Sequence, residues 1–381
     1  MADESINSYR CFGLRVFRVG RVAYTDGSFF MCKTFLLVLA CLFATNPVYG
    51  QTKALEIFKS WDKNGDGILV ISEIPEELRR LFARNDLNKD GKITVREHII
   101  AMGRPAPIQR PQTAVEEIRI RQVWEQEPGG WARRVLIRKP VEINSKLPVV
   151  IFLHGNGGQA DNAITQFRLL SDVIFVCPQG YRRSWNILDE ASEAPDVKFI
   201  TEIIDLLRSR VRDADMENVT LIGSSNGAGM IYRLLIEIDR KPFQKAACLV
   251  SSMVEKQYHD GAFWVSSEEG TNRYDQKKRP SRGPRVVYFH GTDDRIVPYY
   301  GGNRGNVAHV SAQETAFAFA KAFGYTGAKI PDREAEAIVP GVFKYDYPEA
   351  KLTHFKLQGE GHGIARYREF VDTAIRDLIF Q

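Results

Sequence analysis

A serine that could act as a nucleophile stands in the pentapeptide Gly223-Ser224-Ser225-Asn226-Gly227. The pentapeptide directly follows an apolar run at 219–222 and precedes a helix-like stretch at 230–238. Small residues two positions either side of a serine permit the sharp strand-to-helix turn that exposes its hydroxyl. The positive end of the following helix then faces the reaction centre. A Gly- and Ser-rich surface loop without a function can have the same sequence. The remaining polar motifs therefore decide whether this pentapeptide is a nucleophile turn or such a loop.

Polar groups also follow three other strand-like runs. The loop at 154–158 begins with His154 after the run at 148–153, and the loop at 290–294 ends in two aspartates. His362 lies in a Gly-rich stretch after the final run. Because open α/β sheets place their chemistry at the carboxyl ends of parallel strands, we expect these groups to lie near Ser225.

The elements that must position these groups alternate from residue 115 onward between apolar strand-like runs and helix-like segments. This pattern predicts an α/β fold, with a mostly parallel sheet covered by helices on both faces. The clearest helices are expected at 197–210 and 312–323. An antiparallel opening pair is followed by six further strands, at 118–124, 132–138, 148–153, 173–177, 219–222, 246–250, 286–289 and 354–357.

Together these segments resemble the α/β-hydrolase fold, which uses the chain order Ser, Asp, His. Within that fold the chain is similar to the secreted esterase family of polyhydroxybutyrate depolymerases and feruloyl or acetyl-xylan esterases. The resemblance spans roughly residues 118–380 and implies that the eight strands lie in the order 1-2-4-3-5-6-7-8. It is carried by Phe-Leu-His-Gly-Asn-Gly-Gly at 152–158, Cys-Pro-Gln-Gly at 177–180, Trp185-Asn186, Gly-Ser-Ser-Asn-Gly at 223–227 and His-Gly-Thr-x-Asp at 290–294.

Position by position, the resemblance implies that Ser225 is the nucleophile and His362 the general base. Asp294 would orient the imidazole and stabilise the imidazolium. Asp294 is preferred to Asp293 because it lies four residues after His290 and three before Val297.

The same resemblance implies an oxyanion hole made by the backbone N–H groups of Asn156 and Asn226, with Gly157 as the alternative to Asn156. Trp185 and Asn186 either line the acyl or alcohol pocket or pack in the interior. His154 and His290 are interpreted as structural hydrogen-bonding residues.

Two loops near the N-terminus, at 62–73 and 86–97, each match the EF-hand pattern D-x-N-x-D-G-x5-E. Calcium takes oxygen ligands from positions 1, 3, 5, 7 and 12 of such a loop. The flanks predict a small all-α segment. The loops start 24 residues apart (62 and 86), room for one shared helix, which puts their mutual pairing in doubt. The expected Ca²⁺ ligands, with a structural rather than a sensing role, are Asp62, Asn64, Asp66, Ile68 (carbonyl), Glu73, Asp86, Asn88, Asp90, Lys92 (carbonyl) and Glu97.

Residues 1–50 are interpreted as a leader and signal peptide. A charged start at Met31, an apolar stretch at 34–44 and small residues at Val48 and Gly50 predict cleavage after Gly50. The apolar stretch is too short to span a bilayer. Residues 1–30 are then an extended leader or follow a start codon placed too early. A lipoprotein anchored at Cys41 is the alternative, but it would shorten the apolar region. We expect a secreted or periplasmic protein without a stable membrane span.

Three parts should follow the signal peptide: an EF-hand pair at 51–103, a Pro-rich linker at 104–114 and an α/β-hydrolase domain at 115–381. The linker has prolines at 105, 107 and 111, which favour an extended chain. Cys177 and Cys248 lie on strands that the family order separates by two others, so no disulfide is expected between them.

Composition excludes some functions. The net charge is +5, and no long basic run appears. The short cluster Lys277-Lys278-Arg279 is interpreted as a solvated loop rather than a nucleic-acid surface. The stretch 155–160 fits a dinucleotide fingerprint, but the opening antiparallel pair and the lack of a strand-end acid some twenty residues later disfavour nicotinamide binding.

The sequence therefore predicts a serine carboxylesterase that acts through an acyl-enzyme on a small-molecule, carbohydrate-linked or polyester substrate, with no cofactor for catalysis. A serine peptidase of the same fold and an inactive calcium-binding scaffold are the alternatives. The long polar segment at 253–284 could cover the active site and shape the substrate pocket.

Overall fold

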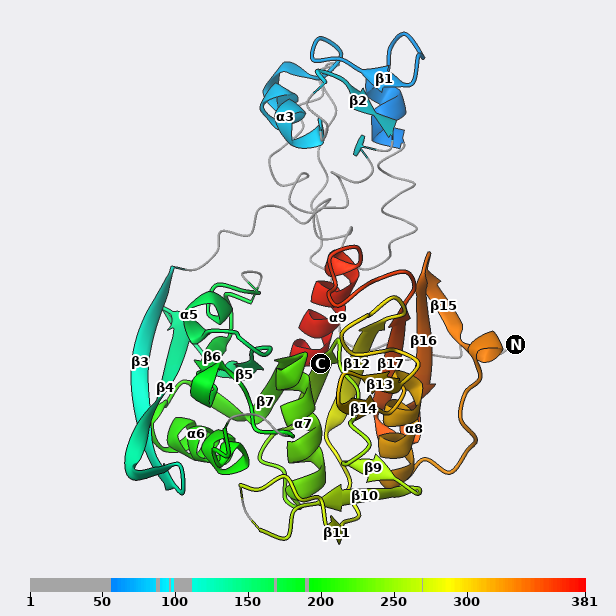
Figure 1. Cartoon of the computed structure of the whole chain (residues 1–381). Helices are drawn as coiled ribbons and strands as arrows, with labels where there is room; N and C mark the ends of the chain where they lie inside the picture. The colour runs from blue at the N-terminus through cyan, green and yellow to red at the C-terminus, as the bar shows by residue number, and fades with distance from the viewer. Residues whose placement is uncertain are drawn as a thin grey trace, which may run out of the picture. The chain divides into compact units, whose positions relative to one another are not determined.

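The computed structural model describes residues 56–86, 90–95, 97–98, 112–167, 170–188, 192–268 and 270–381. The chain divides into two units between Gln109 and Arg110, a position inside the predicted linker. Figure 1 shows the chain coloured from the N-terminus to the C-terminus. The predicted leader and signal peptide, with Met31 and Cys41, lie outside the described residues, as do residues 99–111 and Asn88.

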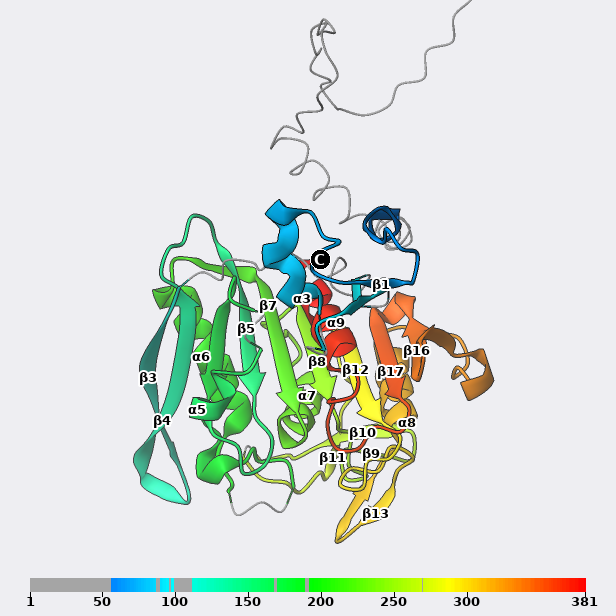
Figure 2. The same ribbon diagram turned by 90° about the horizontal axis from the view of Figure 1, so that it is seen from above.

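The larger unit is built on a ten-stranded sheet (Figures 1 and 2). Its strand order is β15-β16-β17-β12-β8-β7-β5-β6-β4-β3. The six strands from β6 to β17 run parallel, and β4 and β3 continue the sheet antiparallel. The bounds are β3 Thr113–Trp124, β4 Glu127–Pro140, β5 Leu147–Leu153, β6 Ile174–Pro178, β7 Ala214–Ser224, β8 Lys245–Leu249, β12 Arg285–Gly291, β15 Glu336–Val339, β16 Val342–Tyr347 and β17 Leu352–Leu357. The α/β-hydrolase fold class and the expected order of the eight strands are confirmed.

Strands β15 and β16 were not predicted. They form an antiparallel hairpin that adds to β17 and extends the sheet beyond the expected eight strands. The hairpin turns at Pro340-Gly341, where Gly341 has φ 82°. A Pro-Gly pair between two short runs of alternating apolar residues is a turn signal that could have revealed it.

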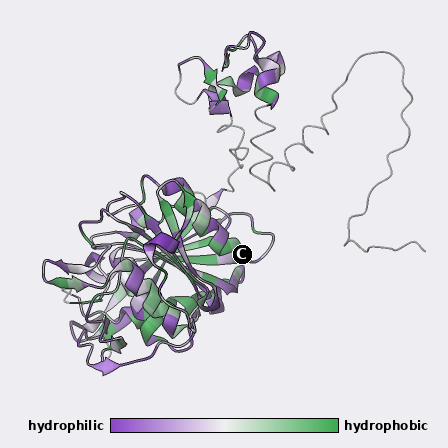
Figure 3. Ribbon diagram, turned by 90° about the vertical axis from the view of Figure 1, so that its right-hand side faces the viewer, coloured by the Kyte–Doolittle hydropathy of each residue, from purple (hydrophilic) through white to green (hydrophobic). Residues whose placement is uncertain are grey.

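Helices cover both faces of the sheet because successive side chains of each strand point to opposite sides. On β5, Val149 and Ile151 join the core beneath α6, α7 and α8, whereas Val150 and Phe152 join the core beneath α5 and α9. Hydrophobic residues accordingly follow the strands through the interior (Figure 3). The helices are α5 Ala160–Ala163, α6 Asp196–Arg210, α7 Asn226–Glu237, α8 Ala312–Ala322 and α9 Arg368–Phe380, with 3-10 turns at Tyr181–Arg183, Asp332–Glu334 and Pro348–Ala350.

The segment at 253–284 forms a small sheet of its own, in the order β11-β10-β9. Its strands are β9 Tyr258–His259, β10 Ala262–Val265 and β11 Gln276–Lys277. Phe263 packs on Phe319 of α8 with ring centroids 5.0 Å apart, and Lys278 Nζ donates to the carbonyl of Glu237 at the end of α7 (2.7 Å). These contacts place β10 and Lys278 against α8 and the end of α7. A second hairpin, β13 Gly302–Arg304 and β14 Val307–His309, follows the 290–294 loop.

Cys177 on β6 and Cys248 on β8 are buried free thiols, and β5 and β7 lie between their strands as expected. Burial raises the pKa of both thiols.

The smaller unit pairs its two loops directly. Strand β1 (Ile68–Leu69) runs antiparallel to β2 (Ile93–Thr94), with Leu69 opposite Ile93. The doubt about loop pairing was therefore wrong, and the segment is not all-α. A 3-10 turn at Glu76–Leu81 and the short helix α3 (Phe82–Asn85) fill the span between the loops. The unit has a core of its own, made by Phe58, Leu69, Ile74 and Ile93.

Within the residues described, no helix combines the length and apolar character needed to cross a membrane.

Candidate active site

Ser225 occupies a strained turn between β7 and α7. Its backbone has φ 54° and ψ −119°, a conformation that non-glycine residues rarely adopt and that is found at nucleophile elbows. A Cβ at Gly223 would lie 2.5 Å from the carbonyl of Gly227. A Cβ at Gly227 would approach the carbonyl of Leu153 more closely than the 3.0 Å that real Cβ atoms keep. The two glycines are therefore required for the strand and helix to meet at this angle.

The ends of three parallel strands bring Ser225, Asp294 and His362 together. His362 Nε2 lies 2.9 Å from Ser225 Oγ, and His362 Nδ1 lies 2.8 Å from Asp294 Oδ2. Ser225 follows β7, Asp294 follows β12 and His362 follows β17. A base within hydrogen-bond reach of a hydroxyl, itself oriented by a carboxylate, is the arrangement that activates a serine.

Asp294, not its neighbour Asp293, is the carboxylate beside His362. Asp294 is buried, and its Oδ1 accepts the N–H groups of Ile296 (2.8 Å) and Val297 (2.9 Å). Burial alone would raise the pKa of Asp294, but hydrogen bonds from His290, His362 and the backbone outweigh burial and hold the pKa below its ordinary value. Asp293 is exposed and accepts the hydroxyl of Thr292. The carboxylate at 294 therefore stays ionised.

His290 lies directly behind Asp294. Its Nε2 is 3.1 Å from Asp294 Oδ2 and 3.0 Å from the carbonyl of Val297, two acceptors that place the ring proton on Nε2. Its side chain is 1% exposed, and its Nδ1 has no hydrogen-bond partner among the described residues. Asp294 Oδ2 is thus shared by two imidazoles, His290 and His362.

The His362 loop is held from both sides. Gly359 N–H donates to Thr292 Oγ1 (2.8 Å), and Asp293 N–H donates to the carbonyl of Glu360 (2.9 Å). On the other side, Gln358 N–H donates to the carbonyl of Gly341, at the turn of the β15–β16 hairpin (2.8 Å). The hairpin that sequence reasoning missed is therefore part of the support of this histidine.

His154 fixes the early Gly-rich loop. Its Nδ1 lies 2.8 Å from the carbonyl of Gly155, and its Nε2 accepts the N–H of Gly180 at 3.1 Å, which defines one neutral tautomer. Burial lowers the pKa of His154 and favours this neutral form. Gly157 N–H donates to the carbonyl of Arg183 (2.8 Å), so it is not available to an oxyanion. Asn156 is therefore the better candidate for the second oxyanion donor.

Trp185 and Asn186 are fully buried, so neither side chain offers surface to a substrate. Trp185 Nε1 donates to the carbonyl of His154 (2.8 Å). The side chain of Asn226, next to the nucleophile, accepts Trp185 N–H (2.7 Å) and donates to the Trp185 carbonyl (3.1 Å). The predicted pocket role is replaced by a positioning role, in which Trp185 joins the early loop to the start of α7. No sequence signal marked the Asn226 side chain for this task.

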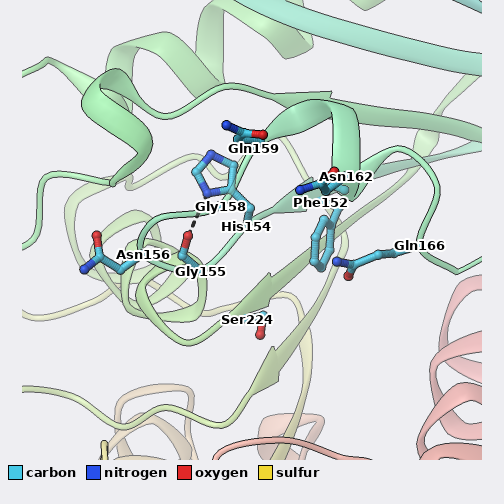
Figure 4. Close-up of a pocket in the computed structure, with 10 residues that line it drawn as sticks. Phe152, His154, Gly155, Asn156, Gly158, Gln159, Asn162, Gln166 and Ser224 are labelled. Carbon is cyan, nitrogen blue, oxygen red and sulfur yellow. Dashed lines mark hydrogen bonds between the residues drawn. The ribbon is translucent and has the colours of Figure 1, made fainter.

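A hollow of about 250 Å³ opens beside the early loop (Figure 4). It is bounded by Ser224 and Gly155, which adjoin the nucleophile, and by Phe152 on β5. Four amide side chains also line it, those of Asn156, Gln159, Asn162 and Gln166. Ser225, Asp294 and His362 do not line it. The hollow therefore adjoins the loop that contains Asn156, the expected oxyanion donor.

The two N-terminal loops share glycines in the left-handed region at matching positions. Gly67 and Gly91, at position 6 of each loop, have φ 78° and 80° and make the expected sharp bend. Asp62 accepts the N–H of Gly65 (2.8 Å) and of Gly67 (2.9 Å), and Asp86 accepts the N–H of Gly91 (2.9 Å). An all-oxygen donor set fits calcium chemically. However, no three His, Cys, Asp or Glu side chains of the described residues converge as a metal site.

No protein-family model matches the sequence, and no curated protein matches it. Solved structures are similar at low identity. An acetyl xylan esterase from Aspergillus awamori is 18% identical over 63% of this chain and 92% of that chain, with a TM-score of 0.45. An S-formylglutathione hydrolase from Agrobacterium tumefaciens is 15% identical over 69% and 95%, with a TM-score of 0.42. A poly(3-hydroxybutyrate) depolymerase from Bordetella parapertussis is 14% identical over 65% and 84%, with a TM-score of 0.40. At this level of similarity the function must be judged from the residues of the site.

Proposed function

We propose that this protein is a serine carboxylesterase that cleaves its substrate through an acyl-enzyme. The observation that supports this function is the hydrogen-bonded series Ser225 Oγ, His362 Nε2, His362 Nδ1 and Asp294 Oδ2, placed on a strained turn. Such a series lets a hydroxyl act as a nucleophile near neutral pH.

In the acylation step Ser225 Oγ attacks the ester carbonyl carbon while His362 Nε2 takes the hydroxyl proton. The resulting imidazolium is stabilised by Asp294, whose hydrogen bonds keep it ionised. The negative charge on the carbonyl oxygen would be met by the N–H groups of Asn156 and Asn226. His362 then gives its proton to the leaving alcohol, and a water activated by the same imidazole releases the carboxylic acid and restores Ser225.

The substrate is proposed to be a small-molecule, carbohydrate-linked or polyester ester, on the strength of the motifs at 152–158, 177–180, 223–227 and 290–294.

We further propose that the protein is exported by the signal peptide that starts at Met31. Its two N-terminal loops would hold calcium as a structural element. Asp62, Asp66 and Glu73, with Asn64 and the Ile68 carbonyl, would hold one ion, and the matching positions from Asp86 to Glu97 the other.

A fluorophosphonate probe tests the nucleophile. Wild type should be labelled, Ser225→Ala should not, and the matched variant Ser224→Ala should be labelled as wild type is. Labelling that survives in Ser225→Ala would refute the assignment. A panel of p-nitrophenyl acetate, methyl ferulate, hydroxybutyrate oligomers and peptide amides then separates the reaction classes. Turnover of peptide amides alone would replace the esterase with a peptidase, and absence of labelling would favour an inactive scaffold.

A further inference from the structure

A second hollow, of about 390 Å³, lies between α8 and the β9–β11 sheet. We call it the basic groove. It is formed by the segment at 253–284, which the proposed catalysis does not use. Its lining is Tyr258, Gly261, Ala262, Phe263, Lys277, Lys278, Arg279, Ala318, Lys321 and Ala322.

The floor of the basic groove is apolar. Phe263 and Ala318 are only 7% and 3% exposed. The ring of Phe263 is wedged between Tyr258 and Phe319, with centroids 4.9 Å and 5.0 Å away. This packing fixes the floor, so a ligand would meet a preformed apolar surface, as in most small-molecule sites.

The rim of the groove carries four cations and no acidic side chain. Lys278 pairs with Asp239 (3.2 Å). The other three have no carboxylate partner among the described residues. Lys277 Nζ lies 5.1 Å from the ring centroid of Trp264, and Lys321 Nζ donates to the carbonyl of Thr326 (3.3 Å). Glu314, whose negative charge acts on Tyr258, is already paired with Lys329 (2.8 Å). The rim therefore presents uncompensated positive charge around an apolar floor.

The basic groove is separate from the nucleophile. Lys278 bonds the carbonyl of Glu237, the last residue of α7, whereas Ser225 immediately precedes the first residue of that helix. Twelve helical residues at a rise of about 1.5 Å span roughly 18 Å. A ligand in the basic groove would therefore not contact Ser225.

We propose that the basic groove binds a small amphipathic carboxylate. The apolar body of the ligand lies on Phe263, Ala318 and Ala322. Its carboxylate is held by Arg279, whose planar guanidinium suits a carboxylate, with Lys277 and Lys321 adding charge. A neutral apolar ligand would gain no binding free energy from the cations of the rim, and an inorganic anion would gain none from the apolar floor. The proposal does not depend on the esterase activity, since binding requires no step at Ser225.

Isothermal titration calorimetry tests this proposal on the full chain carrying Ser225→Ala, which removes turnover. The probe is 4-phenylbutyrate, compared with 4-phenylbutan-1-ol and butyrate. We expect one 4-phenylbutyrate site, with weaker binding of both comparators. Adding Arg279→Glu and Lys321→Glu should raise its Kd at least about fivefold. Adding Ala322→Leu should weaken it by filling the floor without any change of charge.

Lys198→Glu is the matched control, because Lys198 is an exposed cation on α6 outside the groove. It should leave the Kd unchanged. Equal binding of the alcohol, equal loss in Lys198→Glu, or no heat from 4-phenylbutyrate would overturn the proposal. The same groove substitutions are also made in the protein that retains Ser225, where fluorophosphonate labelling shows whether each variant still folds. If the wild type itself is not labelled, that result contradicts the proposed esterase activity and not the proposed binding in the basic groove.

Discussion

Replacing His290 by leucine tests how the charge of Asp294 is held in place. Asp294 accepts four hydrogen bonds, two on each carboxylate oxygen, and the variant removes the one from His290 Nε2 at 3.1 Å. A hydrogen bond to a charged group contributes about 1.5–3 kcal/mol. If most of that free energy serves to orient the carboxylate for His362, kcat should fall roughly 10- to 100-fold.

The pH profile distinguishes this positioning role from a packing role. Without the His290 donor the pKa of Asp294 rises, so the carboxylate holds the His362 proton more tightly. Because His362 must be neutral to act as a base, the acid limb of the kcat/KM profile should move to higher pH by up to about one unit. The assay is p-nitrophenyl acetate hydrolysis from pH 5 to 9.

His290→Gln, which retains an N–H donor, should recover part of the rate and return the acid limb toward its wild-type position. Circular dichroism and thermal melting report whether each variant folds. A folded His290→Leu protein with the wild-type rate and the wild-type pH profile would refute the reasoning.

Three further outcomes follow from the same structure. Gly227→Ala should lower the free energy of unfolding in urea by about 3 kcal/mol or more, because its Cβ would meet the backbone at Leu153, whereas Gly129→Ala, with open space around it, should change little. Burial lowers the pKa of His354 to about 3, so the unfolded state binds this proton more readily. Stability should therefore rise with pH between about 3 and 6.5, by about 1.4 kcal/mol per pH unit for this group, and His354→Gln should flatten that slope in denaturant titrations at several pH values. Terbium added to the protein should show luminescence sensitised by Trp61, and calcium should abolish that luminescence by displacing the terbium. The luminescence should also be lost in the double variant Glu73→Gln, Glu97→Gln; emission that persists in that variant would place the ion elsewhere.

The sequence predicted those parts of the site that are marked by residues close to them in the chain. Ser225, Asp294 and His362 each follow an apolar strand within a few residues, and the ends of parallel strands meet at one edge of a sheet. Strand order came from the resemblance to a known fold, since no local pattern specifies which strand lies next to which. The pairing of β1 with β2 was doubted because a 24-residue spacing leaves room for one shared helix between the loops, yet a 3-10 turn and the short helix α3 fit into that span.

Other contacts depend on residues far apart in the chain. Arg133 on β4 forms a buried ion pair with Asp196 on α6, and nothing near either residue in the sequence marks the other as its partner. Of the two roles left open for Trp185, lining a pocket or packing in the interior, the structure shows the second, because the fold closes over the side chain completely. Burial of a single side chain is a property of the assembled layers, so it could not be deduced from a loop motif.

The support of the His362 loop has a consequence for how the protein loses activity. The nucleophile is held at the centre of the sheet between β5 and β8, whereas the base depends in part on Gly341, in a hairpin at the sheet's margin. Marginal hairpins open locally at lower free energy than central strands. Mild denaturant or heat should therefore separate the base from the serine while most of the sheet is still intact. In such a state the protein would keep its architecture and Ser225 in place but would lose the proposed means to deprotonate that serine.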